Sequence, residues 1–168
     1  VSEKFKEHLK DMKQTIQHCG VGGHHHNAHA ENGIKIVSQK ARTMLFHCAL
    51  YWPEETNLKL WPQAMNYAVH LHNEMIQLDS GWAPIELWSK LNSTYASLRE
   101  AHTWGCPAYV LDPNLQDGQK IPKCQKRSCM GQFVGVSSNH ASSVGLIRHL
   151  RTKNISPQFH VVYDDFFE

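Results

Sequence analysis

Four polar residues in the first half of the chain have types and spacing that suit phosphate chemistry. Glu31, Lys35, Ser38 and Arg42 follow one another at steps of three and four residues, which keep to one face of a helix. A carboxylate there is a candidate ligand for a divalent metal, and the two cations suit phosphate groups. The alternative is a solvated helix face with an intrahelical Glu31–Lys35 pair, which contributes only a few tenths of a kcal/mol. The spacing by itself favours this second interpretation.

Apolar periodicity predicts the elements that must position these residues. A helix over 28–51 ends before Pro53, and its buried stripe is expected at Ile34, Val37, Ala41, Leu45 and Cys48. Further helices are expected over 3–18, from Trp61 onward and over 84–91. Strands are expected at 108–111, 132–136, 144–150 and 159–163. The pattern predicts an α+β protein with a helical part at 1–103 and a strand-rich part at 104–168.

The composition is that of a globular protein, with 41% hydrophobic and 19% charged residues among 168. The net charge of +2 is weak evidence for a polyanionic partner, although some of the 13 histidines gain charge near pH 6. Five irregularly spaced cysteines do not suit a disulfide framework, which favours reduced thiols in an intracellular compartment. No apolar run is long enough to span a membrane. The start at Val1, which is not a methionine, is a first hint of truncation, although processing would give the same start.

Three other clusters have alternative interpretations. His24–His26 and His29 lie near Cys19, but the cysteine is single and the histidines are bunched on a loop, so a zinc site is disfavoured. The basic cluster of Lys120, Lys123, Lys126 and Arg127 suits phosphate neutralisation or a solvated linker, and both remain open. Asp164, Asp165 and Glu168 lack metal-ligand spacing and are expected to form a solvated edge.

The stretch from His26 to Leu45 resembles the third-acid motif of copia-type retrotransposon integrases. The family pattern is Q-N-G-x-x-E, then a basic helix leading to A-R-x-M-L. It corresponds here to residues 26–31 (HNAHAE) and 41–45 (ARTML). Further blocks follow in family order at 60–64 (LWPQA), 83–88 (APIELW), 104–110 (WGCPAYV), 131–136 (GQFVGV) and 155–165 (ISPQFHVVYDD). The chain departs from the pattern at His26, Ala28 and Asn32, where the family has Gln, Gly and Arg.

The resemblance implies the last helices of an RNase H-like integrase core, followed by a small antiparallel β module of SH3-like character. Such integrases are polynucleotidyl transferases in which two aspartates and one glutamate hold two Mg²⁺ or Mn²⁺ ions for strand transfer. By resemblance Glu31 is the third carboxylate, both catalytic and metal-binding. The two aspartates are expected upstream of Val1, so this fragment is expected to be inactive and to bind no metal ion alone.

The resemblance also implies DNA as a partner and a homo-oligomeric parent complex, located in a cytoplasmic particle and in the nucleus, with no membrane contact. The expected DNA-binding residues are His25, His26, Asn27, Lys35, Ser38, Arg42, Lys123, Lys126 and Arg127. The alternative is a decayed or domesticated interaction module without catalytic activity, in which Glu31 is ordinary surface.

Overall fold

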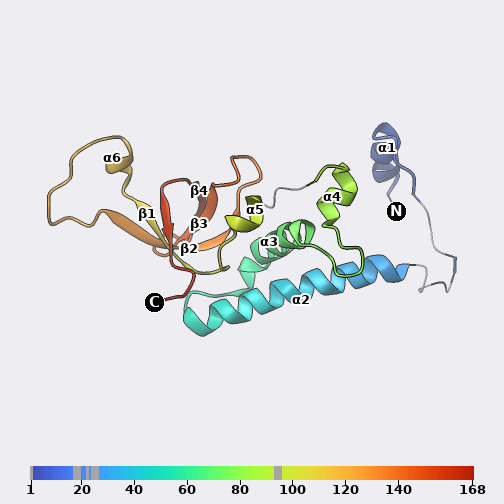
Figure 1. The fold of residues 1–168 in the computed structure, drawn as a ribbon, viewed down its shortest axis with the longest axis horizontal. Helices are drawn as coiled ribbons and strands as arrows, with labels where there is room; N and C mark the ends of the chain where they lie inside the picture. Colours follow the sequence, from blue (N-terminus) through green and yellow to red (C-terminus); the bar gives the residue numbers. More distant parts are fainter. Residues whose placement is uncertain (1, 17–19, 22, 24–26, 93–95) are drawn as a thin grey trace. The chain divides into compact units, whose positions relative to one another are not determined.

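The computed structural model describes residues 2–16, 20, 21, 23, 27–92 and 96–168. Its contacts divide the chain into two compact units, residues 1–35 and residues 36–168. The first unit contains α1 (Glu3–Asp11) and the first turns of α2 (Ala28–Tyr51) (Figure 1). The Ser2 side chain caps α1 by accepting from Phe5 N, and Lys13 turns into the left-handed conformation at φ 54°. The predicted helix over 3–18 is therefore too long, because the helix already ends at Asp11.

The second unit contains the rest of α2, four helical segments and then the strands. The helical segments before the sheet are the 3₁₀ helix η2 (Leu58–Leu60), α3 (Trp61–Glu74), α4 (Pro84–Ser89) and α5 (Ala96–Arg99). The strands are β1 (Pro107–Leu111), β2 (Ser128–Val136), β3 (Gly145–His149), β4 (Ile155–Gln158) and β5 (Val161–Tyr163), and the short helix α6 (Pro113–Gln116) follows β1. None of the helices in the described residues is long and apolar enough to cross a membrane.

The predicted helices agree best with the structure where a buried apolar stripe is followed by a residue that ends a helix, such as Pro53. α2 has the predicted bounds, and its stripe is buried at Val37, Ala41, Leu45 and Cys48. The predicted burial of Ile34 is wrong: its side chain is 65% exposed, because the buried cluster begins at Val37. α3 begins at Trp61 with proline in its first turn, and α4 ends at Ser89, two residues earlier than predicted.

The five strands form one antiparallel sheet in the order β4-β3-β2-β1-β5. The strands predicted at 108–111, 132–136 and 144–150 are confirmed, although β2 begins earlier, at Ser128. The strand predicted at 159–163 is confirmed as β5, although β5 begins two residues later, at Val161, whereas β4 was not predicted. Helices followed by an antiparallel sheet confirm the α+β class.

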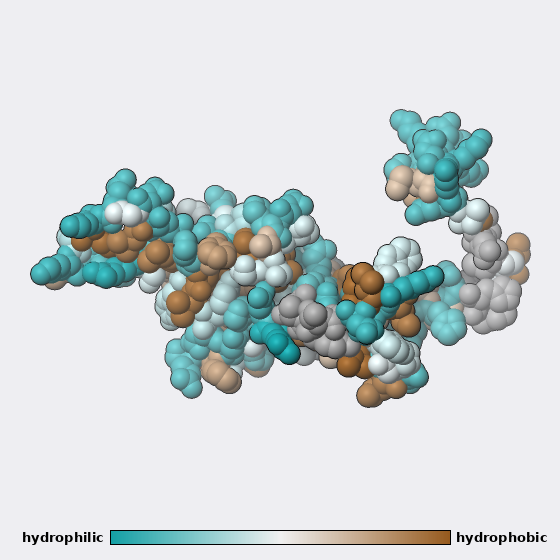
Figure 2. All heavy atoms as spheres, turned by 45° about the horizontal axis from the view of Figure 1, so that its top comes forward, coloured by the Kyte–Doolittle hydropathy of each residue, from teal (hydrophilic) through white to brown (hydrophobic). Residues whose placement is uncertain are grey.

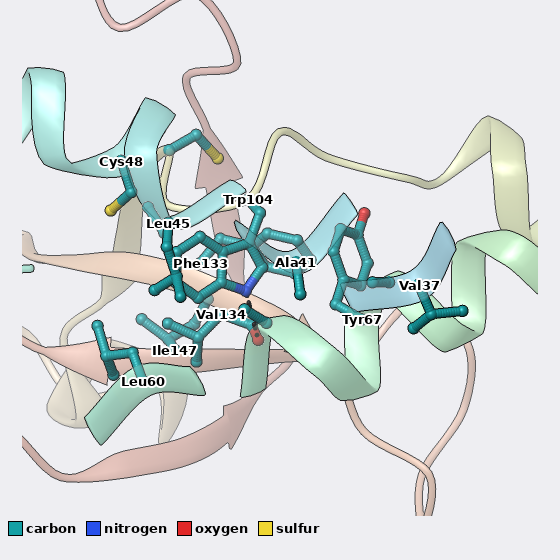
Figure 3. Close-up of a cluster of buried hydrophobic side chains, with 14 residues drawn as sticks. Val37, Ala41, Leu45, Cys48, Leu60, Tyr67, Trp104, Phe133, Val134 and Ile147 are labelled. Carbon is teal, nitrogen blue, oxygen red and sulfur yellow. Dashed lines mark hydrogen bonds between the residues drawn. The ribbon is translucent and has the colours of Figure 1, made fainter. Parts of the chain in front are cut away.

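Helices and strands of the second unit share one hydrophobic core, in which Tyr67, Trp104 and Phe133 lie together (Figure 3). The Trp104 indole donates to the Val134 carbonyl at 3.1 Å, and the Tyr67 and Phe133 rings meet edge to face at 5.3 Å. The core therefore contains residues from both sides of the predicted domain boundary. The division into domains 1–103 and 104–168 stays a prediction.

Gly105 forms a corner where the end of α2 meets the sheet. Its φ is +86°, and a Cβ built there would lie 2.6 Å from Cys48 Sγ. Its N–H donates to the Phe133 carbonyl at 2.7 Å, and its carbonyl accepts from Trp52 Nε1 at 2.9 Å. Glycine is thus required at position 105 for two reasons, its positive φ and its lack of a side chain.

Replacing Gly105 should test this double requirement. The left-handed backbone costs a non-glycine residue about 1–2 kcal/mol, and overpacking against Cys48 adds about 1–3 kcal/mol, so Gly105→Ala should reduce the free energy of unfolding by their sum. Gly118→Ala is the matched control, because Gly118 has φ +77° but no atom within 4 Å of its Cβ position. Urea denaturation measures both, and equal losses would contradict the steric part.

Candidate nucleic-acid interface

The predicted contact residues of α2 differ in exposure. Glu31 and Lys35 are exposed and belong to the first unit. In the second unit Ser38 is half-buried, and Arg42 is exposed with its guanidinium 5.2 Å from the centre of the Phe46 ring. The flat guanidinium over the ring is a cation–π arrangement that leaves the outer N–H groups available. Arg42 can therefore contact a phosphate, whereas Ser38 is less accessible.

The loop before α2 is only partly described. His25 and His26 lie outside the described residues, as do His24 and Cys19 of the zinc hypothesis, whereas Asn27 is exposed directly before the helix. Within the described part of the chain, no group of three or more His, Cys, Asp and Glu side chains is arranged to hold a metal ion. A single exposed carboxylate such as Glu31 does not fit a two-ion centre, and no catalytic step through Mg²⁺ follows for this chain.

The basic cluster lies in the loop between α6 and β2. Lys120, Lys123, Lys126 and Arg127 are all exposed, and none of them forms an ion pair with another described residue. The Asp112 N–H donates to the Arg127 carbonyl at 2.9 Å, which fastens the end of the loop to β1. These side chains are free to contact an anion. No hydrogen bond or ion pair between described residues joins this loop to α2.

Other cations of the second unit are already paired within the fold. Arg148 is buried and donates to Gln132 Oε1 at 2.6 Å and to the Glu55 carbonyl at 3.0 Å. The Glu55 carboxylate pairs with Arg148 and with Lys153, and the hydrogen bond from Lys153 holds the pKa of Glu55 below its ordinary value. Arg148 and Lys153 therefore join the loop after α2 to the sheet and are poor candidates for phosphate contacts.

A cluster around Asp165 fastens the end of the chain to the segment before β1. Its carboxylate lies 2.9 Å from His102 Nδ1 and accepts from Thr103 N at 2.6 Å. The His102 ring stacks on Tyr163 with centres 3.7 Å apart. Burial alone raises the pKa of Asp165, but the hydrogen bonds from His102 and Thr103 outweigh it and hold the pKa below its ordinary value. The expectation that Asp165 lies on a solvated edge is therefore wrong.

His102, Asp165 and Cys106 lie together here, and their contacts stabilise the fold. Cys106 is fully buried and hydrogen-bonds to Asp165. Burial raises the pKa of its thiol far above the ordinary value, with the Asp165 charge adding to the effect. Because the thiolate is the nucleophile, a thiol held neutral in the core does not attack a substrate. Sequence spacing could not reveal this cluster, since 63 positions separate His102 from Asp165.

Removing the Asp165 charge should destabilise the second unit in a pH-dependent way. Asp165→Asn should lower the free energy of unfolding at pH 7 by about 1–2 kcal/mol, because charged hydrogen bonds to a partly exposed group are lost. The folded pKa lies below the unfolded value, so the stabilisation is present above about pH 4 and disappears as the pH falls through the folded pKa.

Urea denaturation of both proteins at several pH values measures this difference. Asp79→Asn, at an exposed aspartate outside the cluster, serves as the control and should change little. A stability difference between parent and Asp165→Asn that grows toward acidic pH would contradict the interpretation.

A cavity of about 630 Å³ lies between α3 and the β2–β3 hairpin. Gln63, Asn66 and His70 line its helical side, and serines of the hairpin line the other. The Gln63 Oε1 atom is buried without a hydrogen-bond partner in the described residues. No lysine, arginine or carboxylate lines this cavity, so it does not suit a phosphate.

Comparison with known proteins finds no matching family model, no matching curated protein and no matching solved structure. The integrase resemblance therefore stays a prediction from motifs.

Proposed function

We propose that this chain is the carboxy-terminal part of a copia-type retrotransposon integrase and supplies DNA contacts to the parent enzyme. The ordered series of motifs from residue 26 to residue 165 supports this proposal. The α+β arrangement, with helices before a small antiparallel sheet, is compatible with it. In the proposal, the helices end an RNase H-like core and the sheet is the SH3-like module that follows.

The observation that carries the DNA-binding part is the set of exposed, unpaired cations in the loop before β2. Lys123, Lys126 and Arg127 have no carboxylate partner among the described residues, in contrast to the paired Arg148 and Lys153. Cations that replace the counterions of duplex DNA give affinity independent of sequence, and this affinity falls steeply with salt. Lys35 and Arg42 of α2 are exposed and supply further contacts in the proposal.

Glu31 has a role only in the intact parent. Its carboxylate is exposed in the first turn of α2, and in the proposal it joins two upstream aspartates around two Mg²⁺ or Mn²⁺ ions. The parent would act as a homo-oligomer on element DNA, first in a cytoplasmic particle and then in the nucleus. This chain by itself should lack strand-transfer activity, because one carboxylate cannot position two ions.

A salt titration of duplex DNA binding tests the proposal. Affinity should be measurable by gel shift at about 50 mM salt and should fall steeply toward about 200 mM. Combining Lys123→Gln with Lys126→Gln should lower the slope of log affinity against log salt by about 2, since each phosphate contact contributes about 0.9. Lys153→Gln is the matched control, because Lys153 is already paired with Glu55. Absence of binding at low salt, or binding without salt dependence, would reject the proposal.

The role of Glu31 is testable in a longer protein. In a core reconstructed with the two upstream aspartates, Glu31→Gln should abolish metal-dependent strand transfer while leaving salt-dependent DNA binding nearly unchanged. Isothermal titration with Mn²⁺ should show that the variant loses metal affinity. Strand transfer at the parental rate in the variant would contradict the metal-binding role and show that Glu31 is an ordinary surface residue.

The rival function, an interaction module without catalysis, is favoured by one surface. Leu87 and Trp88 of α4 are 57% and 87% exposed, and Trp82 just before the helix is 49% exposed. Exposed aromatic and aliphatic side chains of this kind are typical anchors of protein interfaces. A chain that fails to bind duplex DNA, and that self-associates until Trp88→Ser restores the monomer, would support this rival.

A further inference from the structure

A hollow of about 460 Å³ lies on the sheet where β1 and β5 meet the loop before β2. Residues of β1, of β5 and of the turn before β5 form most of its lining. It is lined by Tyr109, Leu111, Arg127, Ser128, Phe159 and residues 160–162. Figure 2 shows apolar atoms between hydrophilic ones at the end of the second unit that carries α6.

Strand register places three exposed apolar side chains in one row across the sheet. Tyr109 of β1 pairs with Met130 of β2 on one side and with Val162 of β5 on the other. Directly paired residues in antiparallel strands point to the same face. All three are exposed, at 37%, 40% and 70%, so this face is uncovered by the rest of the described chain.

Two aromatic rings of the hollow are open to solvent. Phe159 is 63% exposed in the turn between β4 and β5, and its edge contact with His160, at 5.1 Å between ring centres, leaves a ring face free. Neither Phe159 nor Tyr109 belongs to the hydrophobic core. Tyr109, Phe159 and Val162 line one hollow, so the apolar surface here is contiguous, which is typical of an interaction site.

The electrostatic character of the hollow points to an anionic ligand. Of its lining residues, all of which are described, Arg127 is the charged one and none is acidic. The neighbouring segment 112–127 contains Lys120, Lys123, Lys126 and Arg127 against Asp112 and Asp117. Asp112 is engaged as the cap of α6, where its Oδ1 accepts from Asn114 N at 3.0 Å.

We propose that this hollow is a binding platform for single-stranded nucleic acid, formed by Tyr109, Phe159, Val162 and Arg127. Unpaired bases stack on Tyr109 and Phe159, Val162 supplies the apolar floor, and Arg127 contacts a phosphate. Duplex DNA keeps its bases stacked inside the helix and cannot present them to a concave apolar surface. The inference goes beyond the proposed function and does not depend on it, because it rests on exposed aromatic rings and not on the integrase resemblance.

Fluorescence anisotropy of the whole chain with a labelled oligothymidylate, its RNA counterpart and a matched duplex tests the platform. Tyr109→Leu and Phe159→Leu should each weaken single-strand binding about tenfold, the effect expected when a stacked base loses its aromatic partner. Tyr109→Phe should retain the affinity, and Arg127→Gln should reduce the salt slope by about 0.7. Phe166→Leu is the matched control, because Phe166 is 83% exposed and does not line the hollow.

Circular dichroism should show the same thermal melting for each variant as for the parent, so that a loss of affinity is not a loss of fold. Equal effects of Phe159→Leu and Phe166→Leu would overturn the proposal, as would binding of duplex alone. Binding to phosphatidylserine vesicles without binding to either oligonucleotide would overturn it in favour of a membrane surface. Dimerisation abolished by Val162→Lys, without oligonucleotide binding, would overturn it in favour of a second copy of the chain.

Discussion

The second unit depends on the close approach of backbone to side chain at Gly105. Cys48 Sγ lies 2.6 Å from the position that a Cβ on residue 105 would take, and the two backbone groups of Gly105 bond to Trp52 and to Phe133. This contact fixes the end of α2 against β2. Trp104 then reaches the core from one side of the corner and Cys106 from the other. With the corner open, Cys48 near the end of α2 would lose its contacts with Gly105 and with Gln132 of β2.

Local signals in the sequence predicted the elements that are bounded by local chemistry. The apolar stripe and Pro53 together defined α2, and Pro62 defined the start of α3. The strand β4 was missed, because it contains Ser156 and Pro157, which are residue types typical of turns. Contacts between distant positions, such as His102 with Asp165, have no local signature and could not be predicted.

For the candidate site too, the sequence shows which residue types are present but not how they are arranged. The sequence supplies 17 lysines and arginines without separating their roles. The fold pairs Arg148 and Lys153 with Glu55, places Arg42 against an aromatic ring and leaves Arg127 free beside exposed rings. Accessibility thus depends on partners, which the sequence does not reveal. The exposed aromatic face was unpredictable for a related reason, since strand register decides which side chains of a strand lie on the same face.

Both outer strands of the sheet are short, with four residues in β4 and three in β5. Pro157 lies within β4 and has no N–H to offer to an approaching strand. Open strand edges are the usual templates for fibril growth and uncontrolled association. A proline on one edge and very little exposed backbone on the other make this sheet a poor template, so that copies of the chain at high concentration are protected from stacking through their main chains.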